Sequence, residues 1–145
     1  MDIVVDANLT VALFVHLPYS SQSEQLFALW RSQDVQLYVP ALWPAEVVSA
    51  LRKMVSVRQI SSNDARQALA TLEPIPIRVV LPVSSLLNLS LIWAERLKQN
   101  VAYDAQYIAL AESLSAEFWS ADQKLIQTLQ RLEIHWAHGV GEVSQ

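Results

Sequence analysis

The chain of 145 residues contains no cysteine. A disulfide framework, a zinc–thiolate site and thiol catalysis are therefore excluded, and any metal must be bound by oxygen or imidazole ligands. Only two glycines are present, Gly139 and Gly141. The P-loop and the dinucleotide-binding loop both need glycines between an early strand and the helix after it, so these two kinds of nucleotide site are excluded as well.

Positive charge and long apolar runs are also scarce. Ten Lys and Arg residues stand against 14 Asp and Glu residues, which gives a net charge of −4. Sequence-independent binding to nucleic acid comes mainly from Lys and Arg on phosphates, so any contact with nucleic acid should be local. No apolar run reaches the roughly 18 residues of a membrane-spanning helix, and no basic signal-peptide start follows Met1. We expect a cytoplasmic protein without a membrane partner.

Apolar content is high, at 52% of the residues, and is enough for the core of one domain over residues 1–145, with about 137–145 as a tail. Short β-branched runs alternate with segments of helical periodicity. Strands separated by helices cannot pair through hairpins, so we predict an α/β fold, a three-layer α/β/α domain with a mostly parallel sheet of about five strands. Strands are predicted at 3–5, 35–40, 77–81, 117–121 and 134–137, and helices at 8–15, 23–32, 42–58, from 61 or 62 to 73, at 84–97, from 102 onward and at 123–132.

Two acids directly follow predicted strands. Asp6 comes after the strand at 3–5, and Asp122 comes after the strand at 117–121. Ligands of parallel α/β sheets bind beyond the carboxyl ends of the strands, so both acids are candidate site residues. The alternative for each is that its side chain only caps the helix that follows.

Two further acids lie near helix starts. Asp104 shares a helix face with Tyr107, Ile108 and Ala111, a stripe that should face the core. A carboxylate there loses several kcal/mol of solvation unless something compensates it, and the helix dipole returns only about 0.3–1 kcal/mol. Glu46 repeats this pattern more weakly, because a glutamate in a first helical turn is ordinary on its own.

Four carboxylates at one sheet edge would repel each other, at about 4 kcal/mol for two charges about 4 Å apart. A hard divalent cation, Mg²⁺ or Mn²⁺, would relieve this repulsion and suits an oxygen ligand set. Such an ion at such an edge favours phosphodiester hydrolysis. Asn8 and Ser120 are candidate supporting groups that orient the carboxylates, although local turn chemistry would explain both equally well.

The segments around these acids resemble a known family. "VVDAN" with Asp6, "PAEVVSAL" with Glu46, "AYDAQYIALAE" with Asp104 and "SADQKL" with Asp122 are similar to the four acidic motifs of the PIN domain, a Mg²⁺-dependent ribonuclease fold. The size is that of its VapC branch, the toxins of type II toxin–antitoxin systems. The resemblance implies that these four acids are catalytic and bind the metal, that RNA is the substrate, and that the chain forms a homodimer inhibited by a small antitoxin.

The chain departs from the family pattern at a few positions. Members often have glycine where this chain has Ser115 and Ala116, and threonine where it has Ser120, and the bulky Trp119 is less usual. These changes leave the acids intact. They bear on the fit of the substrate more than on catalysis.

Three other functions remain open at this point. The chain could be a PIN nuclease of RNA processing rather than a toxin, or a catalytically silent PIN-like binding scaffold. "DANLT", from Asp6 to Thr10, also resembles the nucleophile motif of haloacid-dehalogenase-like phosphatases. Such a phosphatase would need a lysine and a further acid pair, which cannot be placed convincingly in this sequence.

Two lysines are candidate contacts for an RNA phosphate. Lys53 follows Glu46 by seven residues on the same helix face, and Lys124 follows Asp122 by two. The alternative is that both are ordinary solvated helix charges.

Overall fold

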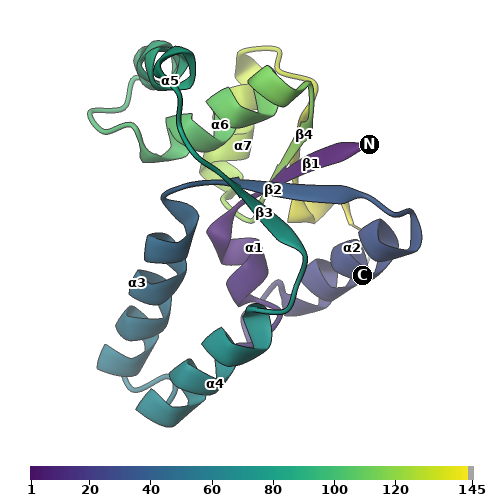
Figure 1. Ribbon diagram of the computed structural model, residues 1–145, viewed down its shortest axis with the longest axis vertical. Coiled ribbons are helices and arrows are strands. Elements are labelled where there is room, and N and C mark those ends of the chain that lie inside the picture. The colour runs from purple at the N-terminus through teal and green to yellow at the C-terminus, as the bar shows by residue number, and fades with distance from the viewer. Residues whose placement is uncertain (144–145) are drawn as a thin grey trace.

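The first strand, β1 (Asp2–Val5), is buried on both faces at the centre of a sheet. Ile3 and Val5 pack into one hydrophobic cluster, while Val4 packs into another on the opposite face. This explains why the strand is a continuous apolar run without polar alternation. The computed structural model describes residues 1–143, and Figure 1 shows its helices arranged on the two sides of this sheet.

The sheet has five strands in the order β3-β2-β1-β4-β5. All four neighbouring pairs are parallel, which confirms the predicted α/β fold and makes the sheet parallel throughout. The other strands are β2 (Gln36–Pro40), β3 (Ile77–Val80), β4 (Glu117–Ser120) and β5 (Ala137–Gly139).

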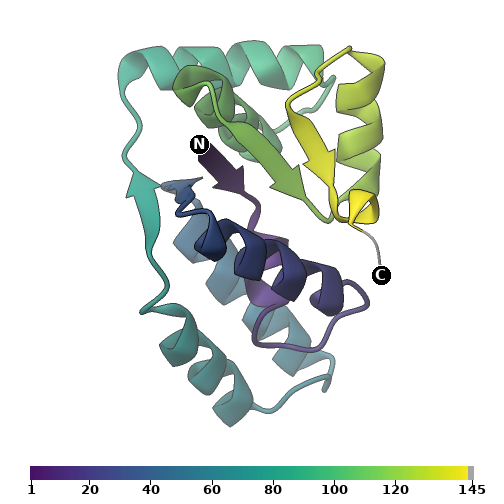
Figure 2. The same ribbon diagram turned by 90° about the vertical axis from the view of Figure 1, so that its right-hand side faces the viewer.

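Seven α-helices in the described part of the chain make the two outer layers. One face of the sheet is covered by α5, α6 and α7, and the other by α1 and α2, while α3 and α4 form a pair that extends beyond the sheet (Figures 1 and 2). The helices are α1 (Ala7–Val11), α2 (Ser20–Ser32), α3 (Trp43–Ser56), α4 (Ser62–Leu72), α5 (Ser84–Arg96), α6 (Tyr103–Leu114) and α7 (Gln123–Arg131), followed by a short 3₁₀ helix, η1 (Val140–Glu142).

The fifth strand begins at Ala137, three residues later than predicted. The predicted start at Ile134 was wrong, because Glu133 has a φ of 61° and the chain is still turning at Ile134, whose N–H donates to the Leu129 oxygen at 3.0 Å. Pairing begins when the Trp136 oxygen accepts a hydrogen bond from the N–H of Phe118 at 2.9 Å. β5 and η1 therefore occupy the segment expected as a tail, whose residues 144 and 145 lie outside the described residues.

The first helix is shorter than predicted. α1 ends at Val11 rather than continuing to residue 15, because the Ser20 hydroxyl donates to the Ala12 oxygen at 2.7 Å and holds the chain in a turn. Among residues 1–143, no helix has both the length and the apolar character needed to cross a membrane.

Candidate active site

Asp6, Glu46 and Ser120 lie at or just after the ends of strands that finish at the same edge of the sheet. Asp6 directly follows β1, and Ser120 is the last residue of β4, which pairs in parallel with β1. Glu46 lies in the first turn of α3, shortly after β2, the other neighbour of β1. Parallel pairing places these carboxyl ends together, so residues far apart in the sequence meet at one place.

Asp6 stands at the N-cap of α1, but its side chain makes no capping hydrogen bond. Its Oδ2 atom instead accepts a hydrogen bond from the Ser120 hydroxyl at 2.7 Å. Ser120 is fully buried, and its Oγ atom also accepts from the N–H of Asp122 at 3.0 Å. The capping explanation therefore does not hold for Asp6, and Ser120 acts as a supporting group for its carboxylate.

Glu46 is held by a tyrosine from another helix. Pro44 occupies the start of α3, as its missing N–H allows, and Glu46 follows in the first turn. The Tyr107 hydroxyl of α6 donates to Glu46 Oε1 at 2.6 Å. Tyr107 is only 2% exposed, so this contact joins two helices across the edge of the site.

Asp104 lies one turn before Tyr107, in the first turn of α6. Tyr107 and Ile108 on the same stripe are buried, as the helical spacing predicted, while Asp104 stays partly exposed at the rim. The Gln99 side chain donates from Nε2 to Asp104 Oδ2 at 2.9 Å.

The charges of three acids act on each other. Burial raises the pKa of Asp6 to about 7, the Ser120 hydrogen bond opposes this rise, and the charges of Asp104 and Glu46 add to it. Burial also raises the pKa of Glu46, with the Tyr107 hydrogen bond opposing and the Asp104 charge adding to the rise. Asp6, Glu46 and Asp104 therefore lie close enough to repel each other.

Asp122 has a different environment. It caps α7, with Oδ1 accepting a hydrogen bond from the N–H of Leu125 at 3.1 Å, so the capping explanation holds for this acid. The N–H of Asp122 reaches Asp6 indirectly, through the Ser120 hydroxyl. Whether Asp122 also binds a cation stays a prediction.

The remaining candidates are Asn8 and two lysines. The Asn8 Oδ1 atom accepts a long hydrogen bond of 3.4 Å from the N–H of Ala121, which ties α1 to the turn after β4. Lys53 and Lys124 are both exposed, Lys53 in the last turn of α3 and Lys124 near the start of α7.

The phosphatase motif finds no support in the position of Thr10. This residue is fully buried, its hydroxyl donates to the Ala7 oxygen at 2.7 Å, and the indole N–H of Trp43 donates to it at 3.1 Å. Thr10 is thus a core contact between α1 and α3.

Sequence analysis missed three polar side chains of this site. Gln99 gave no signal, because it lies in the connection between α5 and α6. Tyr107 was assigned to the core stripe, although a buried tyrosine hydroxyl usually requires a partner, and this could have revealed it. The third is Tyr19 before α2, whose pKa is raised by burial and by the Asp6 charge.

The acids of this site suit a hard divalent cation, although they do not surround one ion with a complete set of protein ligands. Among residues 1–143, no three Asp, Glu or His side chains are close enough, as they stand, to hold one ion together. Mg²⁺ commonly keeps several waters and uses only one or two carboxylates, so it does not need such a set. Carboxylates that repel each other, two of them with raised pKa values, supply the oxygen ligands and the negative charge that such an ion favours.

The fold and the acidic edge define the chain as a PIN-domain protein, since residues 4–137 match that family. Within it the chain belongs to the VapC ribonuclease toxins. It is 35% identical over 128 residues to Ribonuclease VapC9 of Mycobacterium tuberculosis strain H37Rv, an alignment that covers 88% of this chain and 91% of that protein.

Solved structures share the fold at low sequence identity. The structure of VapBC2 from Rickettsia felis bound to a promoter DNA fragment matches with a TM-score of 0.69 and 10% identity, over 96% of this chain and 98% of that one. A toxin–antitoxin complex from Klebsiella pneumoniae matches with a TM-score of 0.62 and 16% identity, over 84% and 88% of the two chains. These likenesses concern the fold alone.

Proposed function

We propose that this chain hydrolyses RNA phosphodiester bonds in the cytoplasm, with Mg²⁺ or Mn²⁺ bound by Asp6, Glu46, Asp104 and Asp122, as the toxin of a type II toxin–antitoxin pair. The observation that carries the proposal is that Asp6, Glu46 and Asp104 lie near each other at the carboxyl edge of the sheet, where the charges of Asp104 and Glu46 add to the raised pKa of Asp6 and the charge of Asp104 adds to that of Glu46. Carboxylates held close together in this way destabilise the fold, and a bound cation would remove this cost.

When bound at this edge, a divalent cation would supply positive charge able to polarise a phosphate oxygen and to lower the pKa of a nearby water. The chain's own part is to hold the carboxylates in place. Ser120 fixes Asp6 and Tyr107 fixes Glu46, each through a hydrogen bond from a buried residue. Groups that are fixed in advance need no reorganisation when charge develops during the reaction.

The test is cleavage of an RNA pool with and without Mg²⁺, by the wild type and by Asp6→Asn and Asp104→Asn. We expect cleavage only with the metal, and a large loss in both variants. Asp34→Asn is a matched control, because Asp34 is exposed and has a φ of 53°, which asparagine tolerates well. Cleavage without metal, or full activity in both site variants, would contradict the proposal.

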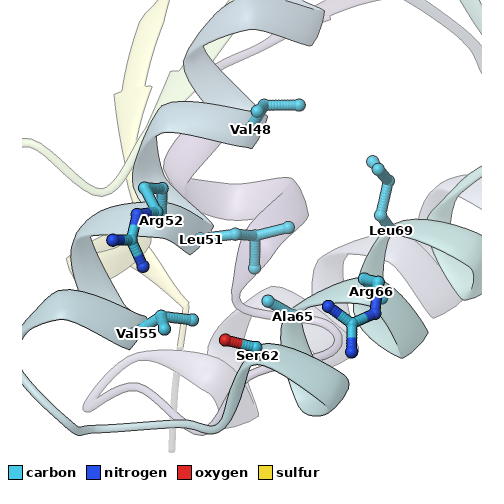
Figure 3. Close-up of a pocket in the computed structure, with 8 residues that line it drawn as sticks. All are labelled: Val48, Leu51, Arg52, Val55, Ser62, Ala65, Arg66 and Leu69. Atoms are coloured by element: carbon cyan, nitrogen blue, oxygen red, sulfur yellow. The ribbon is translucent and has the colours of Figure 1, made fainter.

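An apolar groove between α3 and α4 supports an antitoxin partner. Figure 3 shows the groove with Arg52 and Arg66 among its lining side chains, and its apolar lining includes Val48, Leu51 and Leu69. A partner segment with an apolar face and acidic residues beside it would fit this lining. Val48→Asp should prevent complex formation with the protein encoded by an adjacent small open reading frame, while RNA cleavage stays intact. If no such reading frame exists, the antitoxin part of the proposal fails and the nuclease part stands.

A second exposed apolar surface supports the homodimer. Leu81, 77% exposed, and Val83, 63% exposed, lie between the edge strand β3 and α5, and Leu91 on α5 is 66% exposed. Exposed apolar side chains of this size are typical of contact surfaces between proteins. Leu91→Glu should convert a dimer into a monomer in analytical ultracentrifugation, and an unchanged mass would contradict this assignment.

A further inference from the structure

One aromatic ring differs from all the others in its exposure to solvent. Within residues 1–143, the Phe, Trp and Tyr side chains are buried or half-buried, with the exception of Tyr103, which is 59% exposed. Burial of an aromatic side chain is strongly favourable, and tyrosines that stay exposed are enriched at surfaces that a partner covers. Tyr103 is therefore a candidate contact residue.

Tyr103 lies beside the acids of the candidate site. It is the first residue of α6, and the site acid Asp104 follows it directly. Successive side chains of a helix point about 100° apart around its axis, so the ring of Tyr103 flanks the acidic edge and does not enter it. A phosphate and the base next to it belong to one nucleotide. When a phosphate lies at the acids, a base can therefore reach this flank.

The backbone that carries the ring is fixed by contacts on both sides. The Gln106 side chain donates from Nε2 to the Ala102 oxygen at 3.0 Å and so closes the first turn of α6 around Tyr103. Ala105, two residues on, is fully buried. A tyrosine side chain has only two torsions, so a ring on such a backbone contacts a ligand at a low cost in conformational entropy.

The composition of α6 favours stacking over contacts to phosphate. The helix contains no Lys or Arg, and the whole chain has a net charge of −4. Stacking of a base on an aromatic ring needs no positive charge, and it requires a base whose face is not covered by a duplex. We propose that Tyr103 is an RNA-binding residue whose ring stacks on an unpaired base next to the phosphate at the acidic edge. This inference rests on the proposed function, because it concerns the substrate of the same site.

The test measures RNA binding without cleavage, in the Asp6→Asn background with Mg²⁺ present. Fluorescence anisotropy gives the dissociation constants of a labelled single-stranded RNA pool and of a fully paired RNA duplex for this parent and for Tyr103→Phe and Tyr103→Ala within it. We expect Tyr103→Ala to bind the single strands roughly 10-fold more weakly, a usual effect of losing one stacked base. Tyr103→Phe keeps the ring and should bind them as the parent does. The affinity for the duplex should stay the same in all three proteins, because its bases are not free to stack on a side chain.

Leu29→Ala is the matched control, because Leu29 is exposed in the last turn of α2, close to the start of β2 and thus at the opposite edge of the sheet. It should leave both dissociation constants unchanged.

Several outcomes would overturn the inference. Equal weakening for single strands and duplex would show that Tyr103 does not recognise an unpaired base, and equal weakening by Tyr103→Phe and Tyr103→Ala would show that the hydroxyl makes the contact. Unchanged affinity in Tyr103→Ala, while the wild type still cleaves RNA, would overturn the inference and leave the proposed function in place. A lower mass of Tyr103→Ala in analytical ultracentrifugation would assign the ring to a contact between copies of the chain instead. If the wild type cleaved no RNA and the parent bound none, the proposed function itself would fail, and the inference with it.

Discussion

Asp6 occupies a helix-capping position and does not use its side chain for capping. The carboxylate is instead aligned by Ser120, in a buried place near two other acids. A capping aspartate is stabilising in its charged form, whereas this one is costly to ionise. In its charged form the residue therefore lowers the stability of the free protein, which fits the proposal that it binds a cation.

The first prediction follows from the pKa of Asp6, which burial raises from 3.8 to about 7. The folded state then holds the proton of the Asp6 carboxyl more tightly than the unfolded state does. The stability that this proton binding gives the folded state is present below about pH 4 and is lost as the pH rises towards 7. Asp6→Asn should reduce this decline and, without metal, make the protein more stable than the wild type at pH 8 by about 1–2 kcal/mol. Urea unfolding in EDTA at pH 4.5 and pH 8 measures this. Parallel pH profiles for the two proteins would rule it out.

The proximity of Asp6, Glu46 and Asp104 could be predicted from the sequence, but their hydrogen-bond partners could not. Asp6 and Asp104 interrupt apolar patterns, and an acid in such a pattern is a strong local signal. Tyr107 fits the apolar stripe as well as any core residue, and only the packing of α6 on β1 and β2 brings its hydroxyl to Glu46 at the start of α3. Asp122 remained ambiguous because its capping role and a metal-binding role produce the same sequence pattern.

At the scale of elements, the first residues of helices were predicted well where nearby side chains cap the helix. The Ser61 side chain accepts from the N–H of Asp64, whose carboxylate accepts from the N–H of Ser61, and this capping box starts α4 as expected. The end of α1 and the place of β5 were predicted badly. Both depend on distant contacts, namely the Ser20 hydroxyl on the Ala12 oxygen and the pairing of Trp136 with Phe118.

The second prediction separates the two roles of Asp122 at the start of α7. Asn caps helices about as well as Asp, whereas Ala costs about 1 kcal/mol at an N-cap. If Asp122 also binds the cation, Asp122→Asn should keep the metal-free unfolding free energy but lose Mn²⁺ affinity and RNA cleavage. Ser61→Ala is the control, since it removes a cap of similar strength far from the site and should leave cleavage unchanged. Full cleavage by Asp122→Asn would mean that the residue is only a cap.

At the scale of the whole molecule, the repulsion at the site links ion binding to folding. Mg²⁺ or Mn²⁺ at 100 times its dissociation constant should stabilise the folded state by about 2.7 kcal/mol. For a domain of this size that corresponds to a rise of roughly 5–10 °C in melting temperature. Asp104→Asn should raise the metal-free melting temperature and diminish the rise caused by the metal. Differential scanning calorimetry with and without EDTA tests both, and a wild type that does not respond to either ion would argue strongly against a shared site.

The net charge of −4 limits the electrostatic part of RNA binding by the whole molecule. With few cations, binding should depend only weakly on salt, because each phosphate neutralised on a single strand contributes about −0.7 to the slope of log affinity against log salt. Two contacts, from Lys53 and Lys124, would give a slope of roughly −1.4. Lys53→Ala and Lys124→Ala, each in the Asp6→Asn background to prevent cleavage, should each reduce the slope by about 0.7 in fluorescence anisotropy titrations. Arg31→Ala, at an exposed position on α2, is the control. If all variants keep the slope of the parent, neither lysine contacts the RNA. The affinity of the protein for RNA must then come from the metal site and the neighbouring apolar and polar groups.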